Sequence, residues 1–287
     1  MNIGIIGAEN SHAGQVAKYI NVEKGIKGAA VTHLWGEKDE FAAKTAEQGQ
    51  IPTIVKDPAD MLGEVDGVMI DHRDGKFHLC AARPFVKAGI PVFVDKPMCR
   101  SLAEAKAFLK FRKACRAPVC TMSSIYYHED MPATAKRLQK IGRLRSLRLS
   151  GPGDWNSQWG GIWFYGIHQV ELMVHLLGPA ATQASMSVNG KDCTAVVNYP
   201  EGLTVEMSFL TDCPYRFNLQ AIGHDGSVDW AMGHDPKTLH CTTRIFTKMF
   251  RTRKEPFTDE RMLAPIAILE AMEKSLARKT PVAVAEF

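Results

Sequence analysis

Short apolar runs alternate with longer helical stretches over residues 2 to about 120 of this 287-residue chain. Strands buried on both faces of a sheet have such continuous Val- and Ile-rich runs, as in VDGVMI and IPVFV. Strands separated by helices form a parallel sheet. The pattern therefore predicts a doubly wound α/β domain, with strands at 2–7, 29–36, 51–55, 65–71 and 91–97 and helices at 11–24, 39–48, 76–89 and 101–114.

The pattern changes after about residue 120. Helices are expected at 128–142, 165–178 and 264–279, and strands at 143–153, 183–188, 192–199, 203–210, 216–223 and 226–232. The last five strands are separated by turn signals such as NG, PEG and HDG with no helix between them, which indicates an antiparallel sheet. We expect two domains, one over residues 1–121 and a C-terminal α+β domain over 122–287 with a large, mostly antiparallel open sheet.

Charge and cysteine content narrow the class of protein. The chain has 35 Lys and Arg against 31 Asp and Glu, a net charge of +4, so nucleic-acid binding is not expected. No apolar run approaches the ~18 residues that a membrane span requires. The seven cysteines form no CxxC pair and indicate a reducing compartment. A soluble, cytoplasmic protein is the expectation.

The first strand runs into a glycine turn, GIIGAENSH. Backbone N–H groups at such a turn bind the pyrophosphate of a dinucleotide. Only Gly7 matches the G-x-G-x-x-G fingerprint, because Glu9 and His12 occupy the later glycine positions. Asn10, Ser11 and His12 offer hydrogen-bond donors instead, and Ser11 is the expected N-cap of the following helix.

An acidic residue after the second strand is expected to bind the ribose hydroxyls of NAD. Glu37 stands there, and Lys38 is the only base nearby, so NAD is favoured over NADP. Lys96, in VFVDKP, directly follows a buried strand and is fixed by Pro97. It is expected at the carboxyl edge of the sheet, where it can donate and accept a proton at a carbinol carbon.

The order IGIIG, VDGVMID with FH, AGIPVFVDKP, LGPAATQASM and GHDGSVDWAM resembles the Gfo/Idh/MocA oxidoreductases over almost the whole chain. This resemblance implies an N-terminal Rossmann domain for NAD or NADP and a C-terminal domain that supplies the substrate wall. It also implies a homodimer or homotetramer that forms through the C-terminal sheet. The family's Glu-Lys-Pro triplet matches Asp95, Lys96 and Pro97, so its catalytic Lys corresponds to Lys96; its His after the third-strand loop corresponds to His78.

The family's second motif, D-x-G-x-H-x-x-D, matches FYGIHQVE. Gly166 and His168 agree with it, Glu171 replaces the later Asp, and Phe164 stands in place of the first Asp. The resemblance implies that His168 assists Lys96 in moving the proton. His168, Glu171 and His175 also share one helical face, but three ligands over two turns splay apart, and no metal is expected.

Three Trp, a Phe and a Tyr in DWNSQWGGIWFYG precede His168, beside polar residues. Aromatic faces with polar neighbours suit a sugar or cyclitol ring. In the loop after the strand at 65–71, His72 and Arg73 are expected beside the nicotinamide. Arg73 can bind an acidic substrate or a cofactor phosphate there.

The predicted residues fall into three sets. The catalytic set is Lys96 and His168. The cofactor-binding set is Gly7, Asn10, Ser11, His12, Glu37, His72, Arg73, His78, Asp95, Lys96 and Pro97. The substrate-binding set is Tyr126, Asp154, Trp155, Trp163, Tyr165 and His168.

The function predicted from these sets is an NAD(P)-dependent oxidoreductase that interconverts a hydroxyl and a ketone on a sugar, cyclitol or related small molecule. Two alternatives stay open. One is a glycoside hydrolase or lyase that retains NAD, and the other is a non-catalytic sensor of a dinucleotide or sugar. Lys96 and His168 favour catalysis, whereas Phe164 favours the sensor.

Overall fold

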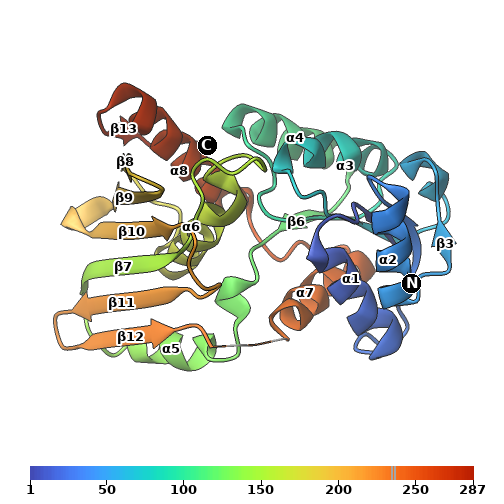
Figure 1. Cartoon of the computed structure of the whole chain (residues 1–287), viewed down its shortest axis with the longest axis horizontal. Coiled ribbons are helices and arrows are strands. Elements are labelled where there is room, and N and C mark those ends of the chain that lie inside the picture. Colours follow the sequence, from blue (N-terminus) through green and yellow to red (C-terminus); the bar gives the residue numbers. More distant parts are fainter. Residues whose placement is uncertain (234, 236) are drawn as a thin grey trace. The chain divides into compact units, whose positions relative to one another are not determined.

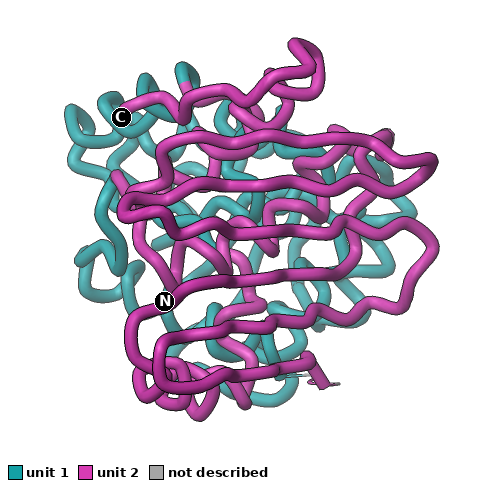
Figure 2. The backbone as a smooth tube through the Cα atoms, turned by 90° about the vertical axis from the view of Figure 1, so that its left-hand side faces the viewer, with its two compact units in different colours: residues 1–99, 103–122, 237–259 teal, residues 100–102, 123–236, 260–287 magenta. Residues whose placement is uncertain are grey.

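The computed structural model describes residues 1–233, 235 and 237–287. The chain forms two compact units, each discontinuous in sequence (Figure 2). The first unit comprises Met1–Cys99, Ala103–Met122 and Lys237–Asp259, and the second comprises Arg100–Leu102, Ser123–Pro236 and Glu260–Phe287.

A parallel sheet forms the centre of the first unit. Among the described residues it has six strands in the order β3-β2-β1-β4-β5-β6. The strands are β1 (Asn2–Ile6), β2 (Ala30–Trp35), β3 (Thr53–Ile54), β4 (Gly67–Ile70), β5 (Val92–Val94) and β6 (Val119–Thr121). The order reverses between β1 and β4, so the predicted doubly wound fold is confirmed. The last strand, β6, was not predicted.

Helices cover both faces of this sheet (Figure 1). They are α1 (Ser11–Ala17) with the π-helical turn Lys18–Val22, α2 (Asp39–Gly49), α3 (His78–Lys87), α4 (Leu102–Cys115) and α7 (Thr238–Thr252). Short 3₁₀ turns lie at Pro58–Met61, Gly75–Phe77, Ile125–Tyr127 and Pro200–Gly202, the last two of them in the second unit. The N-cap of α1 is Asn10 and not Ser11, and its side chain makes no capping hydrogen bond.

Helix α7 returns to the first unit from the far end of the sequence. Phe246 stacks on Phe93 of β5, with ring centroids 4.5 Å apart, and Phe250 packs against Gly67 of β4. The sequence analysis predicted no helix here and assigned these residues to the C-terminal domain. Buried aromatic packing on β4 and β5 explains their place in the first unit. The division into a cofactor domain of 1–121 and a substrate domain of 122–287 stays a prediction.

The second unit is built on a sheet that, in the described part of the chain, has seven strands in the order β12-β11-β7-β10-β9-β8-β13. The strands are β7 (Leu144–Pro152), β8 (Gln183–Asn189), β9 (Asp192–Asn198), β10 (Thr204–Leu210), β11 (Asn218–Gly223), β12 (Ser227–Ala231) and β13 (Val282–Ala283). β7 and β10 pair in parallel and the other pairs are antiparallel, which confirms the predicted mostly antiparallel sheet.

One face of this sheet is apolar and covered by helices, and the other is polar. Helices α5 (Met131–Leu138), α6 (Trp163–Leu177) and α8 (Asp259–Arg278) accompany the sheet, and Ser275 of α8 accepts the N–H of Met186 in β8 at 2.8 Å. Leu149 and Met207 are buried, whereas the intervening Arg148 and Glu206 are exposed and form an ion pair. Among the described residues, the structure has no helix with the length and apolarity of a membrane span.

The packing of α7 yields a stability prediction. Phe246→Ala removes a fully buried ring and should lower the free energy of unfolding by about 3–5 kcal/mol, measured by urea denaturation. The half-exposed Phe77 provides the control, since Phe77→Ala should cost less than about 1 kcal/mol. Equal losses in the two variants would contradict the anchoring role of Phe246.

Candidate active site

The glycine turn after β1 lies against the end of β4. Gly7 has a φ of +110°, and a Cβ atom placed on it would lie 2.6 Å from the backbone nitrogen of His72. Only glycine meets both conditions without strain. Gly7 therefore brings the carboxyl ends of β1 and β4 together, which is the edge where open α/β sheets bind ligands.

Glu37, which follows β2, reaches back to this turn. Its Oε2 accepts the backbone N–H groups of Ala8 at 2.8 Å and Glu9 at 3.1 Å. Its Oε1 is buried and has no hydrogen-bond partner among the described residues. A buried acceptor of this kind is costly unless a ligand donates to it. The position suits a hydroxyl donor such as a ribose.

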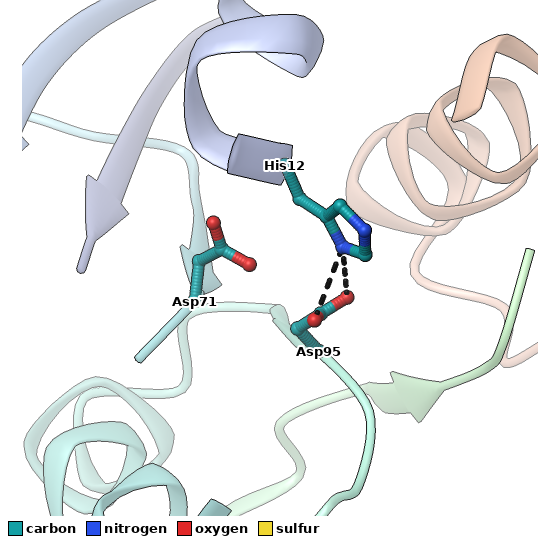
Figure 3. A group of neighbouring side chains, drawn as sticks. All are labelled: His12, Asp71 and Asp95. Atoms are coloured by element: carbon teal, nitrogen blue, oxygen red, sulfur yellow. Dashed lines mark hydrogen bonds and ion pairs between the residues drawn. The ribbon is translucent and has the colours of Figure 1, made fainter. Parts of the chain in front are cut away.

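Two buried carboxylates meet at the ends of β4 and β5 (Figure 3). Asn10 donates from Nδ2 to Asp71 at 3.0 Å and to Asp95 at 3.2 Å. Asp71 also accepts the N–H of Ala13 at 2.7 Å. Asn10 therefore bridges the pair with both amide hydrogens, and these donors are committed to carboxylates in this structure.

His12 pairs with the second of these carboxylates, with Nδ1 3.1 Å from Asp95 Oδ1 (Figure 3). Burial and the charge of Asp95 raise the pKa of Asp71 well above its usual range. Burial opposes ionisation of Asp95 too, but the charge and hydrogen bond of His12, with the charge of Lys96, bring the pKa of Asp95 below its usual range. Of the two carboxyl groups, Asp71 therefore has the higher affinity for a proton and Asp95 the lower.

Lys96 lies next to this pair at the end of β5 and is only 5% exposed. Its peptide bond to Pro97 is cis. His78 connects the loops after β4 and β5, because its Nδ1 lies 2.8 Å from the carbonyl oxygen of Pro97 and its Nε2 lies 2.8 Å from that of His72. Burial lowers the pKa of His78, although both carbonyls oppose this. Its predicted contact with the cofactor stays a prediction, since both ring nitrogens face protein carbonyls.

The ligand atoms of His12, Asp71 and Asp95 all lie within 4.8 Å of one another, so a cation could in principle share them. Both oxygens of Asp71 already accept hydrogen bonds, from Asn10 and Ala13, and Asp95 is paired with His12. The hydrogen-bonded network is the arrangement that the geometry supports.

The other predicted cofactor residues lie around the turn. His72 is buried, and its Nδ1 has no hydrogen-bond partner among the described residues. Arg73 is half-buried, and its charge opposes the rise that partial burial causes in the pKa of Glu9. Ser11 is exposed at the start of α1. His72 and Arg73 therefore remain suited to a ligand at this edge.

In the second unit, His168 lies on the first turns of α6 and is 1% exposed. Its Nδ1 lies 2.7 Å from the Oγ of Ser123. Phe217 and Tyr215 meet its ring edge to face, with centroid distances of 5.5 and 6.4 Å. Ser123, Tyr215 and Phe217 were not predicted from the sequence, because no motif marks them.

The predicted substrate residues separate into two groups. Tyr126, Trp155 and Tyr165 are partly exposed, and Tyr165 lies 6.0 Å from Tyr215 between ring centroids. Asp154 is partly exposed as well, and its Oδ1 accepts the N–H of the residue two positions on. Trp163 is 1% exposed and belongs to the core, so its placement does not fit the predicted substrate contact.

The residues of α6 that depart from the family motif have structural partners. Phe164 is 8% exposed and packs on Tyr165, with ring centroids 4.5 Å apart. Glu171 forms a buried ion pair with Arg261 of α8, and Arg261 also bonds His175. His168 is therefore bonded to Ser123, whereas Glu171 and His175 share Arg261 as a partner.

The buried His72 predicts a loss of stability in acid. Burial lowers its pKa to about 4 from the usual 6.5, so between these values the unfolded chain binds the extra proton. The contribution of His72 to the free energy of unfolding is fully present above pH 6.5. It falls by on the order of 3 kcal/mol as the pH drops towards 4. Unfolding free energies of wild type and His72→Phe, measured from pH 7 to 4, should differ by this pH-dependent amount. The exposed His224 serves as control, and a His72→Phe protein with the wild-type pH dependence would contradict the prediction.

Comparison with known proteins supports the Rossmann assignment. Residues 1–121 match the model of the GFO_IDH_MocA family, an oxidoreductase family with an NAD-binding Rossmann fold. A putative UDP-kanosamine synthase oxidoreductase subunit of Amycolatopsis mediterranei (strain S699) is 26% identical over 128 residues. That alignment covers 40% of this chain and 36% of the relative, so the chain matches about a third of the relative's length.

Solved structures share the fold over the whole chain. GenD2 from gentamicin A biosynthesis, in complex with NAD, has a TM-score of 0.88 at 14% identity, covering 100% of this chain and 97% of that one. Myo-inositol dehydrogenase of Lactobacillus casei, in complex with NAD(H) and myo-inositol, has a TM-score of 0.86 at 14% identity and the same coverage. The match over residues 1–121 identifies an NAD-binding Rossmann domain of the Gfo/Idh/MocA oxidoreductase type, and the solved structures show that the whole chain shares their fold.

Proposed function

We propose that the protein is an NAD-dependent dehydrogenase that interconverts a hydroxyl and a ketone on a sugar, cyclitol or related small molecule. The observation that carries this proposal is the buried Lys96, placed beside an ionised Asp95 at the carboxyl end of β5 in an NAD-binding Rossmann domain. A lysine is seldom buried without a paired charge or a function.

The turn around Gly7 fits the cofactor. Glu37 offers its unpartnered Oε1 to a ribose hydroxyl, and His72 offers its unpartnered Nδ1 at the same sheet edge. When bound, NAD supplies the acceptor for the hydride. The choice of NAD over NADP follows from the negative charge of Glu37, which would repel a 2′-phosphate.

Lys96 is proposed to move the proton of the reacting hydroxyl. Asp95, whose pKa lies below its usual range, provides a negative charge next to Lys96. An ammonium group can donate a hydrogen bond to the substrate oxygen, and its neutral form can accept the proton. His168 of the second unit is proposed to assist through its imidazole.

The class of substrate is argued from the second unit. Partly exposed aromatic rings of Tyr165 and Tyr215 accompany His168, and such rings stack on the C–H faces of sugars and cyclitols. The L. casei neighbour was crystallised with myo-inositol, which makes cyclitols the first substrates to assay. Assembly as a homodimer or homotetramer through the polar face of the C-terminal sheet is part of the same proposal.

A non-catalytic sensor is the second candidate, because Phe164 occupies the place of the family's first motif aspartate and is buried. The two candidates differ in one measurement. An enzyme reduces NAD when mixed with a panel of inositols, sugars and other polyols, whereas a sensor binds NAD without reducing it under any of these conditions.

Removal of Lys96 tests the catalytic proposal. Lys96→Met keeps most of the side-chain volume and should lower kcat by about 10²–10⁴-fold, the range for loss of one acid–base group, with NAD affinity changed less than about fivefold. Initial rates and calorimetric titration measure the two effects. The exposed Lys87→Met provides the matched control. Turnover near the wild-type value in Lys96→Met would remove Lys96 from the mechanism.

Glu37 should set the preference for NAD. Glu37→Gln keeps an oxygen for the N–H groups of Ala8 and Glu9 but removes the charge, so the ratio of NADP to NAD dissociation constants should fall about tenfold. Calorimetric titration with both dinucleotides measures this ratio, and the exposed Glu40→Gln is the control. If the wild-type protein binds NADP at least as tightly as NAD, the assignment of Glu37 is wrong.

A further inference from the structure

We infer that Ser123 is the positioning residue of His168: its hydroxyl holds Nδ1 and thereby presents Nε2 as the nitrogen that acts in the reaction. The inference rests on the proposed function, in which His168 assists the proton transfer. It assigns a role to a serine that lies outside both motifs of the family resemblance.

The contact between Ser123 and His168 is short and buried from solvent. The Oγ of Ser123 lies 2.7 Å from Nδ1 of His168, and the side chains are 2% and 1% exposed. Because both groups are buried, water does not readily replace this hydrogen bond when one partner is lost. The bond therefore constrains the imidazole more than an exposed contact of equal length would.

The hydroxyl is itself held in place. Ser123 is the first residue of the second unit after the Rossmann segment, and its Oγ accepts the N–H of Ile125 at 3.2 Å. That N–H begins the 3₁₀ turn Ile125–Tyr127. The backbone of this turn therefore fixes the oxygen against which the His168 ring is oriented.

The ring plane of His168 is fixed by aromatic packing in the same unit. Phe217 is 1% exposed and meets the imidazole at 61° with centroids 5.5 Å apart. Tyr215 meets it at 88° and 6.4 Å. A ring held on its face and at Nδ1 retains one orientation, so Nε2 is the nitrogen that can exchange a proton with a substrate.

The choice of a serine has a chemical consequence. A carboxylate partner accepts hydrogen bonds only and stabilises the imidazolium, as in a Ser-His-Asp triad. A hydroxyl is both donor and acceptor, and it is neutral, so it serves protonated and neutral His168 more evenly. Nδ1–H can donate to Oγ while Nε2 gains or loses its proton.

The test compares Ser123→Ala with Ser275→Ala, since both serines are buried and both accept one backbone N–H. Ser123→Ala should lower kcat/KM by about 10–100-fold, the range known for outer partners of a metal-bound imidazole, and should shift the pH–rate profile. Ser123→Thr keeps the hydroxyl and should recover activity to within about fivefold of wild type. Ser275→Ala should leave the pH profile unchanged.

A spectroscopic readout is independent of turnover. Long-range ¹H–¹⁵N spectra correlate the ring nitrogens of histidine with its carbon-bound ring protons. In wild type the ¹⁵N chemical shift of Nδ1 of His168 should be that of a hydrogen-bonded nitrogen, and this feature should be lost in Ser123→Ala. If Ser123→Ala does not fold, the isosteric Ser123→Cys, a much weaker hydrogen-bond partner, takes its place with the same expected losses.

The outcomes separate this inference from the function on which it rests. Wild-type activity in His168→Ala would overturn the proposed role of His168 itself. A large loss in His168→Ala, with unchanged kcat/KM, pH profile and ring shift in Ser123→Ala, would overturn only the role of Ser123. Equal changes of the pH profile in Ser123→Ala and Ser275→Ala would show a merely structural effect and would also overturn it.

Discussion

The close approach of Gly7 to the peptide between Asp71 and His72 is the constraint on which the nucleotide site depends. No side chain fits between these backbones, so β1 and β4 end side by side. That register places Asp71 directly above the turn, where Ala13 and Asn10 donate to it. The pairing of β4 with β5 then brings Asp95, and with it Lys96, to the same edge.

The departures from the glycine fingerprint become intelligible in this setting. Asn10 and His12 bring polar side chains to the turn, and both side chains bind carboxylates at the strand ends. Two buried carboxylates so close together cannot both ionise cheaply. Burial and the charge of Asp95 raise the pKa of Asp71, whereas His12 and the charge of Lys96 bring the pKa of Asp95 below its usual range despite its burial. His12, which replaces a glycine of the fingerprint, and the nearby Asn10 therefore form one network with the aspartates.

The sequence predicted most elements because their signals are local. Apolar runs and glycine turns located β1, β4 and β5, and turn residues located the antiparallel strands of the second unit. Helix α7 escaped because its buried residues, such as Phe246 and Phe250, are interspersed with threonines and basic residues, and their partners lie about 150 residues earlier. Long-range packing of this kind leaves no local trace.

The candidate site was predictable only where a motif marks it. Gly7, Glu37 and Lys96 lie at positions defined by the strand ends, and the structure places each at the sheet edge or at the turn. Trp163 could not be separated from its neighbours, because an aromatic-rich segment looks the same whether a ring faces the core or solvent. Ser123 carries no sequence signal at all, since its importance arises from a single contact with a residue 45 positions away.

Each unit thus provides one group suited to proton transfer, and the two groups are supported in different ways. Lys96 is accompanied by the carboxylate of Asp95, which is itself paired with His12. His168 is accompanied by the hydroxyl of Ser123 and by aromatic rings, which fix its orientation. The surroundings of Lys96 therefore act through charge, whereas those of His168 act through orientation.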